Sequence, residues 1–328
     1  MIRAMQIGYG YWGANVARKL TASKWFDFKY LVEADENRRE MARKNVPDSV
    51  EVVETYEDKL NDEIDAVVIC TQTEYSFDIA MKAMQAGKHV FTEKPIATNV
   101  ERTLKLIECA KENGVVLHCD HLMVYNPVIR YIKQMIESGE LGDVMYIDIS
   151  RVNLGPIRKD INALLDLAVH DIAVIDYLLG SLEAEHLNAY GTQFHGQQET
   201  ITYLQMKCNK TLININSSWI SPVKVRRMTI GGTKKMLVFD DVKMDDKLYI
   251  YDSGIDVKQG DIYGEYEFKT RVGDIYVPHI PFEDSLQNSL EHFAECIEEK
   301  KESLSGPEQS LRVMKVLECA QKKLEKSR

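Results

Sequence analysis

The sequence of 328 residues has no long apolar run and no excess of positive charge. Nowhere do about 18 apolar residues follow one another, which argues against a membrane-spanning helix. Its 41 Lys and Arg residues face 51 Asp and Glu residues, and the formal net charge of -10 argues against generic nucleic-acid binding, which needs a basic field. The first strand is expected to begin almost at Met1, which leaves no room for a signal peptide. We therefore predict a cytoplasmic protein with neither a membrane nor a nucleic-acid partner.

Motifs of disulfide, zinc and serine-hydrolase chemistry are also missing. The cysteines are scattered without a C-x-x-C pair, so we expect reduced thiols, mostly in the core. They are Cys70, Cys109, Cys119, Cys208, Cys296 and Cys319. Neither H-E-x-x-H nor a similar ligand spacing occurs, and G-x-S-x-G is absent, so no metal is predicted. What remains is an ordinary globular composition, 45% apolar and 28% charged, in a chain long enough for two domains.

The most informative segment that is present is Gly8-Tyr9-Gly10-Tyr11-Trp12-Gly13. It follows a short apolar stretch at 4–7 that is typical of a strand, and it opens into residues 14–20 with helical apolar spacing. In a dinucleotide site one glycine permits the tight turn, one lets the backbone approach the pyrophosphate, and one lets helix and strand pack closely. The helix N-terminus then faces the phosphate charge. A bare glycine turn is the alternative.

Asp35 supplies a second signal for a dinucleotide. It ends an apolar run at 28–34, which predicts the second strand, and it lies about 20 residues beyond Gly13, where a carboxylate accepts hydrogen bonds from ribose hydroxyls. A carboxylate there repels a 2′-phosphate, and Glu36 adds negative charge. Arg38 and Arg39 follow closely and leave an NADP contact open. The sequence favours NAD over NADP.

Up to about residue 120 the chain alternates strands and helices, which predicts a parallel, doubly wound sheet. Further strands are expected at 66–70, 89–92 and 115–119. Helices are expected at 77–86, ending at Gly87, and from about Thr98 to Gly114. We predict a Rossmann domain over residues 1–120.

Beyond residue 120 the pattern changes. Helices are predicted at 127–139 and 164–179, followed by β-rich stretches without helices between them, which indicates a mostly antiparallel sheet. These stretches are 199–219, 225–239, 247–251 and 263–277, and two closing helices are expected at 282–300 and 307–326. The fold class is therefore α/β for residues 1–120 with a C-terminal α+β domain over 121–328. We allow the last helix to pack back on the first domain.

Lys94 is the first candidate for chemistry. It lies just past the carboxyl end of the expected strand at 89–92, where ligands of open α/β sheets bind. Pro95 restricts it to extended geometry and makes a cis peptide bond possible. A surface lysine before a turn is the alternative reading.

A second candidate group lies on the expected helix at 164–179 and just before it. Asn162, Asp166 and His170 recur every four residues and would share one helix face, apart from the apolar stripe. Histidine titrates near neutrality and suits general acid–base work, and a carboxylate one turn away can orient it. A solvated helix face with an incidental histidine is the alternative.

Polar residues just after the expected strand at 115–119 could line the same cleft as Lys94. They are His118, His121, Tyr125 and Asn126. Linker packing ahead of Pro127 explains them equally well. A cofactor site, a lysine and a histidine–aspartate pair together are the parts that hydride transfer needs.

These residues resemble the Gfo/Idh/MocA family, named for glucose-fructose oxidoreductase, inositol dehydrogenase and rhizopine catabolism, over essentially the full chain. The resemblance is carried by the glycine motif, by Ala86-Gly87-Lys88-His89-Val90, by Glu93-Lys94-Pro95 and by the D-x-x-x-H pair Asp166…His170. It implies an NAD-dependent dehydrogenase acting on CH–OH groups. It also implies a large open sheet in the second domain, often used for homodimer or homotetramer contacts.

The resemblance also implies residue roles. Lys94 would position substrate and nicotinamide, Asp166 would hold the substrate hydroxyl, and His170 would be the general base. The predicted cofactor contacts are Gly8, Gly10, Tyr11, Trp12, Gly13, Asp35, Thr71, Glu93 and Lys94. One departure stands out, because the family often carries T-P-x-x-x-H where this chain has Gln72 and Ser76 after Thr71. A cofactor contact usually made there is in doubt.

Within the family, the segment 151–156 followed by Asn162…Asp166…His170 resembles a subgroup that oxidises C3 of UDP-N-acetylhexosamines. The predicted substrate contacts are Tyr125, Asn126, Asn153, Arg158 and Asn162. Arg151 or Arg158, the latter beside Lys159, would anchor a diphosphate because arginine matches phosphate oxygens in two-pronged geometry. Dehydrogenation of a free sugar or of a polyol such as inositol, reduction of a keto sugar, and a non-catalytic dinucleotide sensor are the alternatives.

Overall fold

The computed structural model describes residues 1–61, 63–158, 161–194, 198–259 and 266–326. The chain forms two compact units: Met1–Asn126 with Glu283–Lys315, and Pro127–Phe282 with Val316–Arg328. The first unit includes residues up to Asn126, whereas the sequence places the domain boundary at 120/121, and a late segment of the chain returns to the first unit. The final helix contributes residues to both units. None of the helices described is both long and apolar enough to cross a membrane.

The first unit is built on a six-stranded parallel sheet of order β3-β2-β1-β4-β5-β6. This is the strand order of a doubly wound dinucleotide-binding fold, as the sequence predicts. The strands are β1 (Ile2–Ile7), β2 (Phe26–Val32), β3 (Glu51–Val53), β4 (Ala66–Ile69), β5 (His89–Thr92) and β6 (Leu117–Cys119). The helices are α1 (Tyr11–Ala22), α2 (Glu36–Asn45), α3 (Thr73–Gln85), α4 (Val100–Glu112) and α7 (Ser285–Glu299), with 3-10 turns η1 (Glu57–Lys59) and η2 (Leu122–Tyr125).

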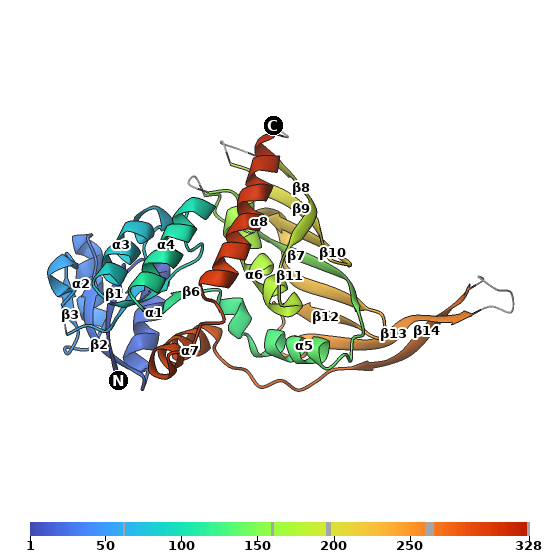
Figure 1. Ribbon diagram of the computed structural model, residues 1–328, viewed down its shortest axis with the longest axis horizontal. Helices are drawn as coiled ribbons and strands as arrows, with labels where there is room; N and C mark the ends of the chain where they lie inside the picture. Colours follow the sequence, from blue (N-terminus) through green and yellow to red (C-terminus); the bar gives the residue numbers. More distant parts are fainter. Residues whose placement is uncertain (62, 159–160, 195–197, 260–265, 327–328) are drawn as a thin grey trace. The chain divides into compact units, whose positions relative to one another are not determined.

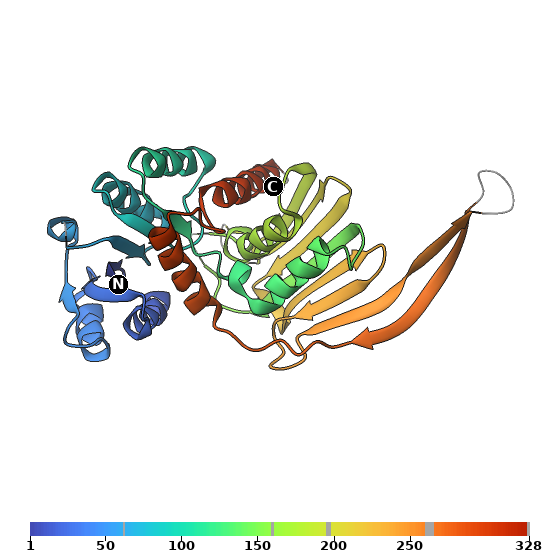
Figure 2. The same cartoon turned by 60° about the horizontal axis from the view of Figure 1, so that its bottom comes forward.

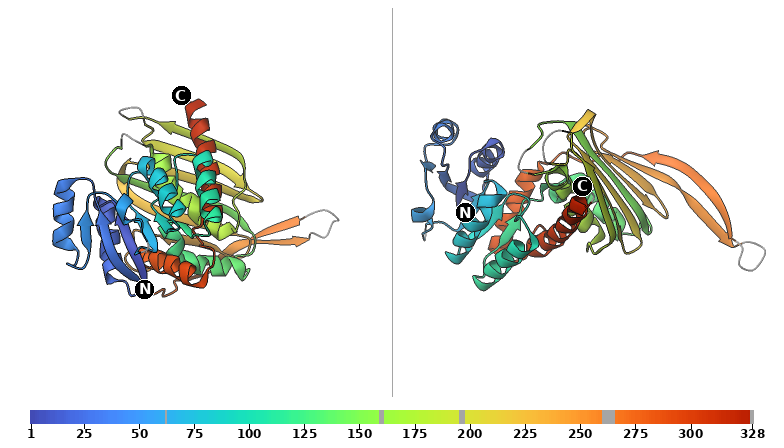
Figure 3. Two further views of the ribbon diagram at one scale, coloured as in Figure 1. Left: turned by 60° about the vertical axis from the view of Figure 1, so that its left-hand side comes forward. Right: turned by 90° about the horizontal axis from the view of Figure 1, so that it is seen from above.

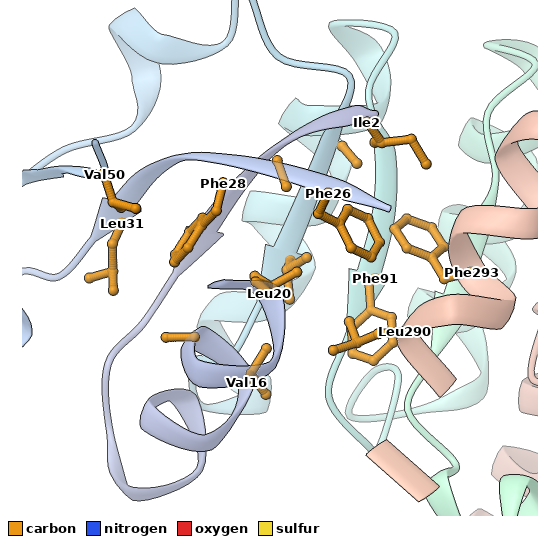
Figure 4. Packing of buried hydrophobic residues seen from close by; sticks show 14 of the residues in the cluster. Ile2, Val16, Leu20, Phe26, Phe28, Leu31, Val50, Phe91, Leu290 and Phe293 are labelled. Carbon is orange, nitrogen blue, oxygen red and sulfur yellow. The ribbon is translucent and has the colours of Figure 1, made fainter. Parts of the chain in front are cut away.

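Helix α7 belongs to this unit because it closes the core beside α1. Leu290 and Phe293 are fully buried against Phe26 and Phe91, and the rings of Phe91 and Phe293 meet edge to face at 5.7 Å (Figure 4). Burying two such side chains is worth several kcal/mol by area, which explains why a segment so distant in sequence returns here.

The second unit is built on an eight-stranded sheet of order β14-β13-β12-β11-β7-β10-β9-β8. Only the β7–β10 pair is parallel, so the sheet is mostly antiparallel, as predicted. The strands are β7 (Val144–Leu154), β8 (Ala184–Thr192), β9 (Ile201–Cys208), β10 (Thr211–Ser218), β11 (Ile220–Gly232), β12 (Met236–Asp240), β13 (Leu248–Gln259) and β14 (Tyr266–Tyr276). The helical elements are α5 (Pro127–Glu137), the π-helical turn η3 (Leu164–Ala168) and α6 (Val169–Leu179), and α8 (Pro307–Lys326) ends the described chain.

Helices α5 and α6 cover one face of this sheet (Figures 1 and 2). Ile147, Ile213 and Ile230 are fully buried on the covered face. On the other face Tyr203 and Leu212 are exposed, so the sheet is open there. The strands β13 and β14 continue beyond the sheet as a two-stranded hairpin (Figure 3).

Several expected boundaries need correction. The second strand ends at Val32, so Glu33 and Asp35 follow it, and α3 begins at Thr73, earlier than the expected residue 77. The helix expected at 164–179 begins with a π turn. The sequence interpretation missed α2, β3, β7 and β8 entirely.

Candidate active site

The glycine-rich turn joins β1 to α1, and its three glycines occupy different environments. Gly8 has a φ of +100°, and a Cβ there would lie 2.7 Å from the Cys70 carbonyl oxygen. A Cβ on Gly13 would lie 2.5 Å from the Gly8 carbonyl oxygen. The side-chain amide of Gln6 donates hydrogen bonds of 2.8 Å to the carbonyls of both Gly8 and Gly13, which fixes the turn from below.

Gly10 differs because nothing lies within 4 Å of the position its Cβ would take. No internal packing therefore requires a glycine there. Gly10 is also the N-cap of α1 and provides no side-chain hydrogen bond to the first turn. An open glycine at an uncapped helix N-terminus fits a site where a phosphate approaches the backbone, so the turn matches the requirements of a dinucleotide.

Two carboxylates follow β2 and have different roles. Glu33 is buried, and it accepts hydrogen bonds from the backbone N–H groups of Tyr9 at 2.7 Å and Asp35 at 3.0 Å. It therefore ties the glycine turn to the end of β2. Asp35 is exposed and is the N-cap of α2, where one carboxylate oxygen accepts the Arg38 N–H at 2.9 Å. The exposure of Asp35 is compatible with the predicted ribose contact.

Of the two arginines that left an NADP contact open, Arg39 is committed elsewhere. Its guanidinium donates to the carbonyl oxygens of Glu33 and Ala34, each at 2.7 Å, and pairs with the Glu36 carboxylate. Arg38 is exposed. Because the guanidinium of Arg39 is occupied by these partners, Arg38 is the better candidate for contact with the 2′-phosphate of NADP.

Thr71 follows β4, and its hydroxyl lies 3.1 Å from the hydroxyl of Ser76 in the first turn of α3. Ser76 is buried and also donates to the Gln72 carbonyl at 3.1 Å. The serine that stands in the family's histidine position is thus part of the β4–α3 turn.

Lys94 lies at the carboxyl edge of the parallel sheet, after β5, and its peptide bond to Pro95 is cis. Asp120 and His121 follow the neighbouring strand β6. The Asp120 N–H donates to the Thr92 carbonyl at 2.8 Å, so the two strand ends are level. Glu93, Lys94, Asp120 and His121 therefore share one edge of the sheet.

The acids at this edge are held in a poorly solvated place. Oε1 of Glu93 and Oδ2 of Asp120 are enclosed without a hydrogen-bond partner among the described residues. Burial, and then the charge of Asp120, raise the pKa of Glu93 to about 8. Burial raises the pKa of Asp120 to about 7, against the lowering effects of the Ser289 hydrogen bond and the Lys94 charge. Near neutral pH the pair therefore retains a proton.

His121 responds in the opposite sense. Burial, and then the charge of Lys94, lower its pKa to about 3, so its ring is neutral at physiological pH. Lys94 thus lies near enough to Glu93, Asp120 and His121 for its charge to act on the pKa of each.

In the second unit Asp166 lies within the π turn η3, a local irregularity common at functional sites. One carboxylate oxygen accepts the indole N–H of the buried Trp219 at 3.2 Å, and the other lies 3.4 Å from the guanidinium of Arg158. Arg158 is exposed. Asp166 is therefore oriented by a fixed donor on one side and a solvent-facing cation on the other.

His170 lies in the first turn of α6 and is half-buried. The next residue, Asp171, is buried and accepts three hydrogen bonds of 2.6 to 3.0 Å from the guanidinium of Arg151 on β7. This ion pair ties the start of α6 to the sheet. Because the guanidinium of Arg151 is buried against Asp171, Arg158 is the better of the two candidates for the diphosphate anchor.

Two residues predicted as substrate contacts are buried in this structure. Asn162 is 1% exposed. Its Oδ1 accepts the Leu165 N–H at 3.0 Å, and its amide donates to Glu199 at 3.0 Å and to Gln321 at 2.8 Å. It does not continue the polar face of α6, because the π turn breaks the four-residue repeat. Tyr125 is fully buried, and its ring stacks on His118 with centroids 5.7 Å apart. These contacts give both residues a role in packing, and their substrate contacts stay predictions.

Both halves of the chain match models of one family. An oxidoreductase family model with an NAD-binding Rossmann fold matches residues 2–121, and the α/β C-terminal model of the same family matches residues 133–328. The chain belongs to the Gfo/Idh/MocA oxidoreductase family. The family resemblance drawn from the motifs is thereby confirmed, as is the NAD-binding fold.

Two curated members of the Gfo/Idh/MocA family are informative. The chain is 31% identical to a UDP-N-acetylglucosamine 3-dehydrogenase from Acidithiobacillus ferrooxidans over 199 residues, which cover 60% of this chain and 61% of that protein. The chain thus matches about three fifths of that relative's length. It is 26% identical to an NAD-dependent scyllo-inositol 2-dehydrogenase from Bacillus subtilis over 252 residues, covering 73% and 69% of the two chains.

A solved structure supports the fold. The UDP-N-acetylglucosamine 3-dehydrogenase of Acidithiobacillus ferrooxidans superposes with a TM-score of 0.83 over 99% of this chain and 98% of that one, at 24% identity. At that identity the likeness shows the fold alone.

Five residues that support the candidate site were not found from the sequence: Gln6, Glu33, Asp120, Asp171 and Trp219. Gln6 and Glu33 carried a signal, since each is a polar residue within or directly after an apolar strand pattern. Asp171, adjacent to His170, carried no signal in the sequence that distinguishes it from a solvent-exposed acid.

The remaining predicted ligand contacts stay predictions. Asn126, Asn153 and Trp12 are half-buried, and Tyr11 is exposed. Lys159 lies outside the described residues. Within the described part of the chain no three His, Cys, Asp or Glu side chains form a metal site.

Proposed function

We propose that the protein is an NAD-dependent dehydrogenase that oxidises a ring hydroxyl of a sugar, with C3 of a UDP-linked N-acetylated amino sugar as the leading substrate. The observation that carries the dehydrogenase is the open Gly10 at an uncapped helix N-terminus in a Gfo/Idh/MocA chain that also keeps Lys94, Asp166 and His170. The named relative at 31% identity supports the nucleotide sugar.

In this proposal His170 takes the proton of the reacting hydroxyl. Asp166, held by the Trp219 N–H, orients that hydroxyl. Lys94 stabilises the developing oxyanion with its charge. Bound NAD would accept the hydride from the same carbon at its nicotinamide ring. The glycine turn would hold the pyrophosphate of NAD, and Asp35 its adenosine ribose.

Arg158 is the proposed anchor for the diphosphate. It is exposed, and its guanidinium lies 3.4 Å from an oxygen of Asp166, so it could bind a phosphate near the residue that orients the sugar. An anchor remote from the reacting bond binds ground and transition states alike, so its loss raises KM more than it lowers kcat.

A polyol or free sugar is the second candidate, favoured by the likeness to the scyllo-inositol 2-dehydrogenase. Keto-sugar reduction uses the same groups in reverse. A non-catalytic sensor would need only the cofactor site, so the presence of Lys94, Asp166 and His170 argues against it. A homodimer or homotetramer and a cytoplasmic location stay part of this proposal.

The deciding experiment incubates the purified protein with NAD and, separately, UDP-N-acetylhexosamines, inositols and free sugars while following the absorbance of reduced nicotinamide. We expect a UDP-N-acetylhexosamine to react fastest, His170→Ala to lower turnover by about 10²–10⁴, and Arg158→Ala mainly to raise KM. The control Lys210→Ala removes an exposed cation in the β9–β10 turn of the same unit and should behave as wild type. Faster turnover of inositol or glucose would exclude the nucleotide-sugar assignment.

A further inference from the structure

A line of hydrogen-bonded side chains runs through the first unit from the carboxyl edge of its sheet. The Ser289 hydroxyl on α7 donates to Oδ1 of Asp120 at 2.8 Å. Nε2 of His118 on β6 lies 3.0 Å from that same hydroxyl oxygen. Nδ1 of His118 lies 2.8 Å from the hydroxyl of Ser303, in the α7–α8 connection. The three inner members are fully buried, whereas Ser303 is partly exposed.

The directions of these hydrogen bonds follow from one another. Ser289 has a single hydroxyl proton and donates it to Asp120, so its oxygen accepts from His118, which must carry hydrogen on Nε2. The bare Nδ1 then accepts from the Ser303 hydroxyl. Every donor in the line therefore points toward Asp120. A core histidine packed only for its apolar ring would not require a serine at each nitrogen.

We propose that Ser303, His118, Ser289 and Asp120 form a proton wire that connects solvent with the sheet edge beside Lys94. The proposal rests on the proposed dehydrogenase function. Oxidation of an alcohol by NAD yields a ketone, the reduced cofactor and one proton, which His170 takes first. That proton then passes from His170 to Asp120 through water in the substrate site, and from Asp120 along the wire to solvent. Reduction in the reverse direction consumes one.

The three transfers occur together, so that His118 and Ser289 each gain one proton as they lose another and stay neutral. Inward, the Ser303 proton passes to Nδ1 of His118, the Nε2 proton passes to the Ser289 oxygen, and the Ser289 proton passes to Oδ1 of Asp120. Water returns a proton to Ser303. Outward transfer is the reverse sequence and returns the line to the arrangement inferred above, with Asp120 ionised.

The surroundings suit this role. Burial, followed by the charges of His292 and His121, holds the pKa of His118 well below its usual range, so the ring stays neutral and can relay protons by changing tautomer. Asp120, with a pKa of about 7, can hold or release a proton near neutral pH. The His118 ring is fixed by stacking on Phe91, with centroids 4.7 Å apart.

The test combines a measurement on the free protein with one on turnover. Nitrogen-15 NMR of labelled histidine in the protein without ligands should find His118 neutral, with hydrogen on Nε2. Ser303→Ala, at the partly exposed end, should fold normally and lower kcat for sugar oxidation about tenfold or more, with KM values unchanged. Its solvent deuterium isotope effect should rise, the effect of deuterium on the reacting carbon should shrink, and added imidazole should restore rate. Ser289→Ala should behave likewise.

The control is Ser310→Ala, which removes a hydroxyl that is as buried as that of Ser289 and belongs to the same unit but lies outside the wire. Hydrogen on Nδ1 of His118, or wire variants with the kinetics of Ser310→Ala, would overturn the proposal. Failure of the proposed function would be recognised separately, because no sugar or polyol would then support the reduction of NAD by the wild-type protein. In that case the tautomer of His118 alone decides whether the line is polarised toward Asp120.

Discussion

The buried ion pair between Arg151 and Asp171 yields the sharpest prediction for the second unit. Both side chains are almost inaccessible, at 10% and 3%, and they share three hydrogen bonds of 2.6 to 3.0 Å. Asp171→Asn keeps the shape of the side chain but removes the charge that compensates the buried guanidinium. Breaking such a pair from one side costs about 3–5 kcal/mol, because one charge stays buried alone.

Removing both charges should be much milder. Arg151→Met combined with Asp171→Leu replaces the pair by apolar side chains, and exchanges of this kind are often neutral or stabilising. Burial and the charge of Arg151 both lower the pKa of the half-buried Arg226. The loss of the Arg151 charge in the double variant should therefore relieve a repulsion on Arg226. The free energy of unfolding of the double variant should thus lie well above that of either single variant.

The assay is urea unfolding followed by circular dichroism, with Arg227→Met as the matched control. Arg227 pairs with Asp240 on the same sheet but its side chain is 54% exposed, so its loss should cost about 0–1 kcal/mol. A cost for Asp171→Asn as small as that of the control would refute the reasoning. Kinetics add a second check, because a double variant that folds well but has a greatly raised KM for UDP-sugars would restore Arg151 as an anchor.

Four further predictions concern the first unit. Gly10→Ala should weaken NAD binding about tenfold or more in titration calorimetry without lowering the melting temperature, whereas Gly13→Ala, which meets a carbonyl oxygen at 2.5 Å, should destabilise the fold. NAD should bind about tenfold or more tightly than NADP, and Asp35→Asn should narrow that ratio; equal binding by wild type would contradict the assignment. Lys94→Ala should lower turnover by about 10²–10⁴ with NAD affinity retained, and wild-type turnover would remove Lys94 from the mechanism. The pKa of Asp120 is about 7 in the folded protein and 3.8 in the unfolded chain, so the stability that its protonation contributes is complete below pH 3.8 and is lost as the pH rises through about 7. Asp120→Asn should therefore flatten the curve of unfolding free energy against pH in this range, measured by urea unfolding. An unchanged curve would disprove this assignment.

The sequence predicts the first sheet well because its strands are buried on both faces. Residues 66–69 are entirely apolar and fully buried, and such runs are the strongest signal of parallel strands. Helix α2 was missed because it is mostly charged, and only Arg39 and Ala42 of its ten residues are buried. A helix held by so few contacts has no apolar period to detect.

The second unit was predicted less completely for a related reason. Strand β7 lies between β10 and β11, but the buried Arg151 stands where an apolar residue would continue the face of Ile147 and Ile149, so the apolar alternation is interrupted. The π turn at 164–168 is equally invisible, because a sequence with helical spacing does not record where one residue is added to a turn. The expected ridge from Asn162 to His170 failed at that turn.

Charged residues were the hardest part of the site to assign, since local sequence does not reveal which partner the fold brings to a side chain. Glu33 and Asp35 are two residues apart after the same strand, yet Glu33 is buried and binds the backbone of the glycine turn while Asp35 is exposed at a helix cap. The exposed carboxylate is the better candidate for a ribose contact, because each oxygen of the buried one already accepts a backbone N–H group. Spacing selected Asp35, whose ribose contact stays a prediction, and the buried Glu33 explains how the glycine turn is held at the end of β2. The surroundings of Asp120 could not be predicted from local sequence, because Ser289 reaches Asp120 and His118 only when α7 returns to the first unit.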